Sequence, residues 1–436
     1  MEKQQKLGLW TSTSLVLGNM IGAGVFMMPS TLASFGGISI VGWIFSSVGA
    51  FFLAKIFAHL SKIMPGSDGG PYAYSKTVLG DFAGFLVAWG YLISVWCTNA
   101  AITVSFVSAL STFIPVLASS PALAVFTGLA TIWILTWVNS LGILATGKLQ
   151  LVTTILKVIP LVMVGLVGLF FIRWDYFLPF NTSGTSSFEA ITATTTLTFF
   201  AFLGIECATI PSGSVANPEK TIARATLLGT LIATAVYILS TVSVMGMIPA
   251  SQLKHTVTPF SDAATMIWGS AAKYWVSGGV AIAAFGALNG YILIQGQLPY
   301  AIAKDKLFPA VFSKTNKRGV PALGVAISSI IVSLFMCMNY TSGLVEKFKF
   351  LILLTTLTVL IPYLFSTAAY IILRLKDSTL SKSIKYSAML LASLAFIFFM
   401  WMIYGSGQEI VYWGFLLCMS SIPVYVWGVW KRDKIN

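Results

Sequence analysis

Glu206 is a residue of unusual placement, because it interrupts the apolar stretch Phe199-Phe200-Ala201-Phe202-Leu203-Gly204-Ile205-Glu206-Cys207. Of the 13 acidic residues, it is the only one that we place well inside a segment long enough to cross a bilayer. A carboxylate at that depth is costly, so it normally faces a cavity or a polar partner and marks a pathway. The alternative is a structural carboxylate that is hydrogen-bonded between neighbouring helices.

A second candidate site is the stretch Leu-Gly-Asn-Met-Ile-Gly-Ala-Gly-Val-Phe at positions 17–26, where glycines interrupt another apolar segment. Gly22 and Gly24 bracket Ala23, so the backbone can unwind there and direct its free amide groups into a cavity. A ligand carboxylate at the start of the second half-helix would satisfy those amides, helped by the helix dipole. Close helix packing through small residues is the alternative.

Metal chemistry and nucleophilic catalysis find little support in the sequence. The four cysteines all fall inside apolar segments and lack the spacing of metal ligands or disulfides: Cys97, Cys207, Cys337 and Cys418. Only two histidines occur, His59 and His255, which leaves no metal cluster and no base for a catalytic triad. We therefore expect neither an enzyme nor a cofactor.

The elements that must position these residues are membrane helices. With 57% hydrophobic residues, 9% charged residues and a mean hydropathy of +0.88, the chain has too little polar surface for a water-soluble globule. Apolar runs of about 20 residues, the length that crosses a bilayer, recur about twelve times. We place them at 10–32, 39–62, 82–114, 122–140, 149–172, 189–212, 225–248, 274–302, 321–338, 350–373, 386–404 and 410–430.

The net charge of +13 is concentrated in alternate loops of the chain. If the N-terminus is cytoplasmic, most of these residues lie in the inner segments. The outer segments hold only Arg173, Lys254, Lys273, Lys347 and Lys349. This asymmetry is the positive-inside rule, with both termini in the cytoplasm, and it explains the basic balance without a nucleic-acid partner.

The positions of the two breaks predict an inverted repeat. Breaks in the first and sixth spans, at corresponding points of two five-span halves, are typical of a transporter with a binding site at the bilayer midplane. We therefore expect a single transporter domain over 1–436, with repeats at 10–172 and 189–373 and two additional helices at 386–430. The sequence similarity between the halves is faint, so this prediction rests on the breaks.

Several motifs resemble the amino acid-polyamine-organocation superfamily, and within it the bacterial basic amino acid/polyamine antiporters, similar to arginine/agmatine antiporters. The resemblance covers nearly the whole chain. Its motifs are Gly18-Asn19-Met20-Ile21-Gly22-Ala23-Gly24-Val25-Phe26, Gly69-Gly70-Pro71-Tyr72-Ala73-Tyr74, Phe202-Leu203-Gly204-Ile205-Glu206, Asn217-Pro218-Glu219-Lys220, Gly246-Met247-Ile248-Pro249 and Pro259-Phe260-Ser261-Asp262-Ala263-Ala264.

The resemblance implies an all-α, leucine-transporter-like fold with discontinuous helices 1 and 6, a bacterial inner-membrane location, alternating access and often a homodimer. It also implies roles for single residues. The substrate-binding positions would be Asn19, Ile21, Gly22, Ala23, Gly24, Tyr91, Asn99, Phe200, Leu203 and Tyr291. Glu206 and Tyr72 match gating positions.

Some residues of this chain differ from the arginine/agmatine pattern, and the differences concern substrate recognition and the coupling of transport to a proton or a fixed charge. Those exchangers carry serine at Ala23 and tryptophan at Phe200 and Tyr291, so this chain lacks a hydroxyl and two large cation-stacking surfaces. Lys157, in the middle of the fifth span, has no counterpart in them but has one in several proton-coupled members. Its ammonium can replace a bound cation beside the first-span break or can carry a proton; the alternative is a lysine that snorkels to an interface.

Three functions remain open at this stage. The first is exchange of a basic amino acid for its decarboxylated amine, and the second is proton-coupled import of an amino acid through Lys157. The third is a sensor or scaffold that does not transport, which the lack of any soluble domain disfavours. The expected partners are a small amino acid or amine and the lipid bilayer.

Overall fold

The computed structural model describes residues 7–22, 24–67, 69–141, 143–210, 212–337 and 344–433, and they form helices almost throughout. Within these ranges, 11 helical segments are long and apolar enough to cross a membrane, and α14 (Ala322–Cys337) is a shorter apolar helix. The described residues contain no β-strand, only an isolated bridge between Leu7 and Val215. The predicted helical membrane fold with about twelve spans is confirmed.

The membrane helices follow one another along nearly the whole chain. They are α1 (Leu9–Met20), α2 (Gly24–Leu32), α3 (Ser39–Ile63), α5 (Asp81–Leu110), α7 (Pro121–Ser140), α8 (Ile143–Gly168), α9 (Ser187–Phe199), α10 (Pro218–Met247), α13 (Ala272–Lys304), α14, α15 (Leu344–Lys376), α16 (Lys382–Gly405), α17 (Gln408–Met419) and α18 (Ser421–Asp433). Four shorter helices lie between them: α4 (Pro71–Leu79), α6 (Val116–Ser119), α11 (Ala250–Leu253) and α12 (Pro259–Trp268).

Local sequence sets where several of these helices begin. Proline occupies the first position of α4, α7, α10 and α12, where its missing amide would have no helical partner. α9 begins with a capping box, in which the Ser186 hydroxyl accepts from the Glu189 amide and the Glu189 carboxylate accepts from the Ser186 amide. These signals fix the starts of helices whose apolar interiors carry little positional information.

The first span is discontinuous, as predicted. α1 ends at Met20; the amide of Ile21 still donates to the Leu17 carbonyl, but that of Gly22 turns back to the Met20 carbonyl at 2.7 Å. This last bond spans two residues instead of four, so the helical ladder stops. α2 resumes at Gly24. Ala23, the remaining residue of the predicted break, lies outside the described residues.

The sixth span is also discontinuous. α9 tightens into the 3₁₀ turn η4 (Phe200–Phe202), the chain extends at Leu203, and a second 3₁₀ turn, η5, covers Ile205–Ala208. Gly204 between the turns has φ +108°, a left-handed conformation that glycine adopts without steric cost. Spans one and six are thus both interrupted, as the leucine-transporter-like fold requires.

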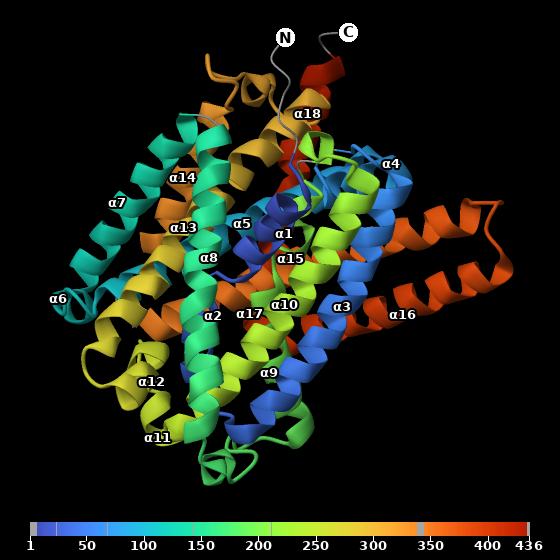
Figure 1. Ribbon diagram of the computed structural model, residues 1–436. Coiled ribbons are helices and arrows are strands. Elements are labelled where there is room, and N and C mark those ends of the chain that lie inside the picture. The colour runs from blue at the N-terminus through green and yellow to red at the C-terminus, as the bar shows by residue number, and fades with distance from the viewer. Residues whose placement is uncertain are drawn as a thin grey trace.

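Connections gather at two opposite ends of the helical bundle. Figure 1 shows α4 and α18 near the top of the view and α11 and α12 near the bottom. At the α4 end, the Gly69 amide donates to the Ile210 carbonyl, and Leu7 pairs with Val215. At the other end, the Ile38 amide donates to the Phe180 carbonyl. In each of these pairs, an even number of spans lies between the two segments along the chain. This agrees with a chain that crosses the membrane repeatedly.

The final predicted span differs in one respect from the structure. We expected a single helix at 410–430, whereas α17 and α18 form two helices with Ser420 between them. Taken together, Gln408–Trp430 is still apolar and long enough to cross. The difference is a local interruption of the helix.

Candidate functional site

The two helix breaks lie directly against each other. A Cβ atom built on Gly204 would lie 3.0 Å from the Asn19 Cβ and 3.1 Å from the Met20 amide nitrogen. A side chain at this position would crowd the end of α1 and would also be strained at φ +108°. This contact brings Asn19, Leu203 and Glu206, which are far apart in sequence, to one place in the bundle.

The first break is enclosed by side chains from three other elements. Ideal Cβ positions on Gly22 lie 3.7 Å from both the Ile102 side chain of α5 and the Ala287 side chain of α13. A Cβ on Gly24 would lie only 2.4 Å from the Phe200 ring. The start of α2, whose first amides have no partner inside the helix, therefore lies directly beneath Phe200. Ile21 is fully buried beside it.

Lys157 reaches the first break from α8. Its side chain is fully buried, and its Nζ donates a hydrogen bond to the carbonyl of Gly18. In a continuous helix that carbonyl would accept from the Gly22 amide, but this amide bonds to Met20 instead. Lys157 thus satisfies a carbonyl that the break leaves free. Its position excludes snorkelling to an interface.

Glu206 lies in a buried cluster with two tyrosines. Its Oε1 accepts from the Tyr91 hydroxyl of α5 at 2.7 Å, and its Oε2 accepts from the Tyr363 hydroxyl of α15 at 2.8 Å. All three side chains are nearly or completely buried. The cluster ties the second half of span six to α5 and α15. The sequence analysis missed Tyr363, because a tyrosine in an apolar run gives no signal before its distant partner is known.

Asn99 and Tyr291 lie on facing sides of α5 and α13. The Asn99 Nδ2 donates to the Gln295 Oε1 at 2.7 Å. Tyr291 lies one helical turn from Gln295 on α13 and is 3% exposed. Both predicted residues therefore lie in the buried region between α5 and α13. Gln295 was not among the predicted site residues.

Tyr72 lies apart from the other predicted residues, at the end of the bundle that holds α4. Its hydroxyl donates to the Asp305 carboxylate at 2.6 Å, and Lys76 forms an ion pair with the same Oδ2 at 2.7 Å. Asp305 directly follows α13, so these contacts join α4 to the end of α13. Burial, and then the hydrogen bond to Asp305, raises the pKa of the Tyr72 phenol, which remains a donor at physiological pH.

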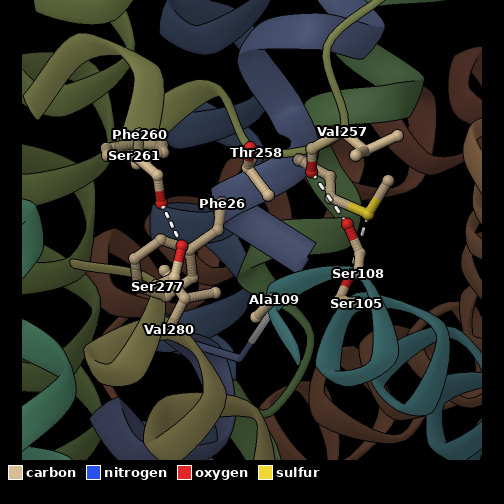
Figure 2. Close-up of a pocket in the computed structure, with 11 residues that line it drawn as sticks. Phe26, Ser105, Ser108, Ala109, Val257, Thr258, Phe260, Ser261, Ser277 and Val280 are labelled. Carbon is tan, nitrogen blue, oxygen red and sulfur yellow. Dashed lines mark hydrogen bonds between the residues drawn. The ribbon is translucent and has the colours of Figure 1, made fainter. Parts of the chain in front are cut away.

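A separate small pocket lies toward the other end of the bundle. Figure 2 shows its lining, in which Ser261 of α12 bonds to Ser277 of α13 at 2.6 Å and Ser108 of α5 donates to the Val257 carbonyl at 2.9 Å. Phe26 of α2 packs edge-on against Phe260, with ring centroids 5.3 Å apart. None of the predicted site residues that the structure describes lines this pocket. The helix α12 therefore covers α2, the second half of the first span.

Comparison with protein families decides which class of membrane protein has these features. The family model described as "Amino acid permease" matches residues 7–425. The chain belongs to the amino acid permease family. This permease is thus a multi-pass membrane transporter of the amino acid-polyamine-organocation superfamily, as the motifs predicted.

Several relatives of this permease are named as antiporters or as an amine transporter. It is 36% identical over 372 residues to a cadaverine/lysine antiporter of Escherichia coli, with 84% of this chain and 83% of the relative covered. It is 30% identical over 426 residues to an arginine/ornithine antiporter of Pseudomonas aeruginosa, with coverages of 94% and 88%. A putrescine transporter of Haemophilus influenzae is 29% identical, and 99% of each chain is covered.

A solved structure supports the fold of the permease. The substrate-bound, outward-open Na⁺-coupled sialic acid symporter aligns with a TM-score of 0.58 at 11% identity, covering 90% of this chain and 89% of the symporter. At that identity the likeness concerns the fold alone.

Proposed function

We propose that this permease exchanges a basic amino acid for its decarboxylated amine by alternating access. The observation that carries the proposal is Glu206, a buried carboxylate beside the two breaks. Its two carboxylate oxygens accept from the hydroxyls of Tyr91 and Tyr363, which are neutral partners. A cationic substrate would supply the positive partner that a buried carboxylate needs.

The first break would recognise the amino acid. Its carboxylate would accept hydrogen bonds from the amides of the first turn of α2, which begins at Gly24, and Phe200 would cover it. The α-amino group would meet the backbone near Phe200 and Leu203. An amine lacks the carboxylate, so the two substrates of an exchange share their cationic groups and the alkyl chain between them. Recognition of a cation is thus the property that both directions of exchange need.

Two closed ends would alternate in the cycle. At one end, Tyr72 and Lys76 of α4 hold Asp305; at the other, Phe260 of α12 holds Phe26 of α2. Tyr91, Glu206 and Tyr363 lie between them and would form a gate next to the substrate. Opening one end would require breaking one set of contacts while the other remains closed.

The substrate pair to test first is lysine and cadaverine, with the arginine/agmatine pair tested in parallel. The support is the lysine antiporter among the relatives and the replacement, at Phe200 and Tyr291, of the tryptophans that arginine/agmatine exchangers carry. The smaller rings provide weaker cation-stacking surfaces. A substrate pair whose cationic groups are smaller than those of arginine and agmatine fits this change.

Uptake of labelled lysine into proteoliposomes tests the proposal. Exchange predicts that uptake requires cadaverine inside the vesicle and proceeds without a proton gradient. Uptake into empty vesicles driven by an inward proton gradient would instead favour symport. Binding without any uptake would favour a sensor.

Proton-coupled import is the second candidate, because Lys157 is buried and bonds to a carbonyl of the first break. If Lys157 releases its proton, the Gly18 carbonyl loses its donor, and the break changes its hydrogen bonds. Proton transfer would then be coupled to movement of α1. This route needs no change in the substrate site.

We also propose that the α4 and α18 end faces the cytoplasm of a bacterial inner membrane. The basic residues of the connections support this orientation, since Lys62, Lys76, Lys304 and Lys306 lie at that end. The homodimer that the resemblance implies stays a prediction that cross-linking in membranes would test.

A further inference from the structure

A chain of buried polar side chains crosses from α5 through α13 to α14. The Asn99 Nδ2 donates to the Gln295 Oε1 at 2.7 Å, and the Gln295 Nε2 donates to the Ser329 Oγ at 2.8 Å. Ser329 in turn bonds to Thr136 of α7 at 2.6 Å. Asn99, Gln295 and Ser329 are all fully buried. Four spans are thus joined by one hydrogen-bond chain.

The direction of this chain is fixed by a backbone carbonyl. The Gln295 Nε2 also lies 3.4 Å from the carbonyl oxygen of Val325. A carbonyl oxygen only accepts, so Gln295 must turn its amino group toward α14 and its oxygen toward α5. Asn99 must then present its amino group to Gln295. The Asn99 Oδ1 is left facing the other way.

The Asn99 Oδ1 is a buried acceptor without a hydrogen-bond partner among the described residues. Leaving such an atom unpaired is unfavourable, and an N–H donor from a ligand would relieve it. Gln295 is therefore more than a structural cross-link, since it decides which atom of Asn99 stays free.

This free acceptor lies between the two parts of the proposed substrate site. On α5, Asn99 is about 4.5 Å along the axis from Ile102, which contacts Gly22, and about 12 Å from Tyr91, which bonds to Glu206. Asn99 thus lies at a level between the first break and the Glu206 carboxylate.

The residues on the facing side of α13 follow the same order along the helix axis. Ala287 contacts Gly22, and Tyr291 and Gln295 follow at steps of four residues on the same helix face. Asn99 and Gln295 therefore lie one and two helical turns from the residues that contact the first break.

We propose that Gln295 is a positioning residue that holds the Asn99 carbonyl oxygen ready to accept a hydrogen bond from the cationic side chain of the cargo. This inference rests on the proposed function and deepens it. An ammonium or guanidinium group donates to that oxygen, whereas a neutral aliphatic side chain leaves it unpaired. Without Gln295, the Asn99 amide rotates and presents its amino group, which repels a cation. Discrimination between charged and neutral side chains therefore depends on Gln295.

Binding of lysine and norleucine to the purified full-length permease tests this role. Norleucine has the same four-carbon side chain as lysine but lacks the ammonium group, so the ratio of the two Kd values isolates cation recognition. Gln295→Met should weaken lysine binding by about tenfold or more and change norleucine binding by less than about twofold. The matched control is Gln297→Met, the same replacement at a half-buried position on the same helix, which should leave both affinities unchanged.

Two further variants separate positioning from a merely structural effect. Gln295→Glu keeps an oxygen toward Asn99 in either protonation state and should retain the lysine preference. Asn99→Leu removes the acceptor, so adding Gln295→Met to it should produce no further loss of preference. Equal weakening of lysine and norleucine by Gln295→Met, or an unchanged ratio, would overturn the inference. A parent protein that binds lysine no better than norleucine would overturn the proposed function itself.

Discussion

Gly204 lies against the backbone of Asn19, with 3.0 Å between a Cβ built on the glycine and the Asn19 Cβ. The broken sixth span and the end of α1 therefore share one contact surface, and neither can shift without displacing the other. Since Glu206 follows Gly204 by two residues and Lys157 bonds to Gly18, both charged groups adjoin this contact. A substrate that moves one break thus changes the surroundings of both charges.

Gly204→Ala tests this contact. Alanine at φ +108° is strained, and its Cβ would crowd Asn19 and Met20, so we expect a loss of about 1–3 kcal/mol of stability together with loss of transport. Gly319→Ala is the control, because it also has positive φ, +74°, but no atom within 4 Å of its Cβ. Thermal melting of both purified variants measures the difference. An equal fall in Tm would show that backbone strain, and not the contact with α1, determines the effect.

Gly24→Ala should weaken binding of every α-amino acid. Its Cβ would lie 2.4 Å from the Phe200 ring, so the ring must move over the amides that we expect to hold the carboxylate. We expect lysine and norleucine to lose affinity by similar factors of about tenfold or more, since overpacking costs about 1–3 kcal/mol. Cadaverine, which has no carboxylate, should lose less. Phe200→Ala removes the clash, so Gly24→Ala should cost little further affinity when it is added to a Phe200→Ala variant. An equally large loss in both backgrounds would contradict the explanation.

The sequence predicted the spans and both breaks well, because hydrophobic runs and glycines are local signals. It predicted Glu206 and Lys157 as unusual for the same reason, since a charge in an apolar run needs a specific environment wherever its partner lies. Tyr363 and Gln295 could not be found in this way. Each contacts a predicted residue across more than a hundred positions, 157 between Tyr363 and Glu206 and 196 between Gln295 and Asn99. Their importance depends on helix packing, which no local pattern specifies.

The sequence assigns both Tyr72 and Glu206 to gating but does not predict that they lie at different depths of the helical bundle. In the structure, Tyr72 bonds to Asp305 at the α4 end, whereas Glu206 bonds to Tyr91 beside the breaks. A motif carries residue type and order but no depth along a helix bundle. The separation of the two proposed gating residues is therefore a result of the three-dimensional arrangement alone.

Glu206→Gln should reduce selectivity for cationic substrates more than it reduces binding of neutral ones. The variant keeps the shape and one acceptor for Tyr91 or Tyr363 but removes the negative charge. We expect lysine affinity to fall by about tenfold or more, as for loss of a hydrogen-bonded charge, and norleucine affinity to change little. Competition binding with both ligands measures the ratio. An unchanged ratio would contradict the cationic-substrate proposal.

The proposed orientation predicts opposite labelling of two exposed positions. Thr315 lies in the connection after α13 and Thr185 lies in the connection before α9, and both are exposed. In a background without the four native cysteines, a cysteine at Thr185 should react with an impermeant maleimide added to intact cells. A cysteine at Thr315 should react only after permeabilisation. Reaction of both in intact cells would overturn the orientation.

Lys157 offers a test that separates a fixed charge from a proton carrier. Its Nζ donates to the free Gly18 carbonyl, so Lys157→Ala should leave that carbonyl without its donor and destabilise the end of α1. Lys157→Arg keeps a positive charge and a donor but does not release a proton. Lys55→Ala is the control, because Lys55 is an exposed lysine whose Nζ lies 4.7 Å from the Phe51 ring centroid. It should transport like the parent.

Uptake of lysine into proteoliposomes over a range of pH, with and without internal cadaverine, distinguishes the two roles. If Lys157 is a fixed charge, Lys157→Arg retains exchange and its pH profile, whereas Lys157→Ala loses most transport. If Lys157 carries a proton, both variants lose uptake driven by a proton gradient, and any exchange that remains no longer depends on pH. Parental rates and pH profiles in both variants would contradict each role. Proton coupling would then lose its support in this chain, because the bond to Gly18 is the contact on which it rests, and exchange would remain as the function to pursue.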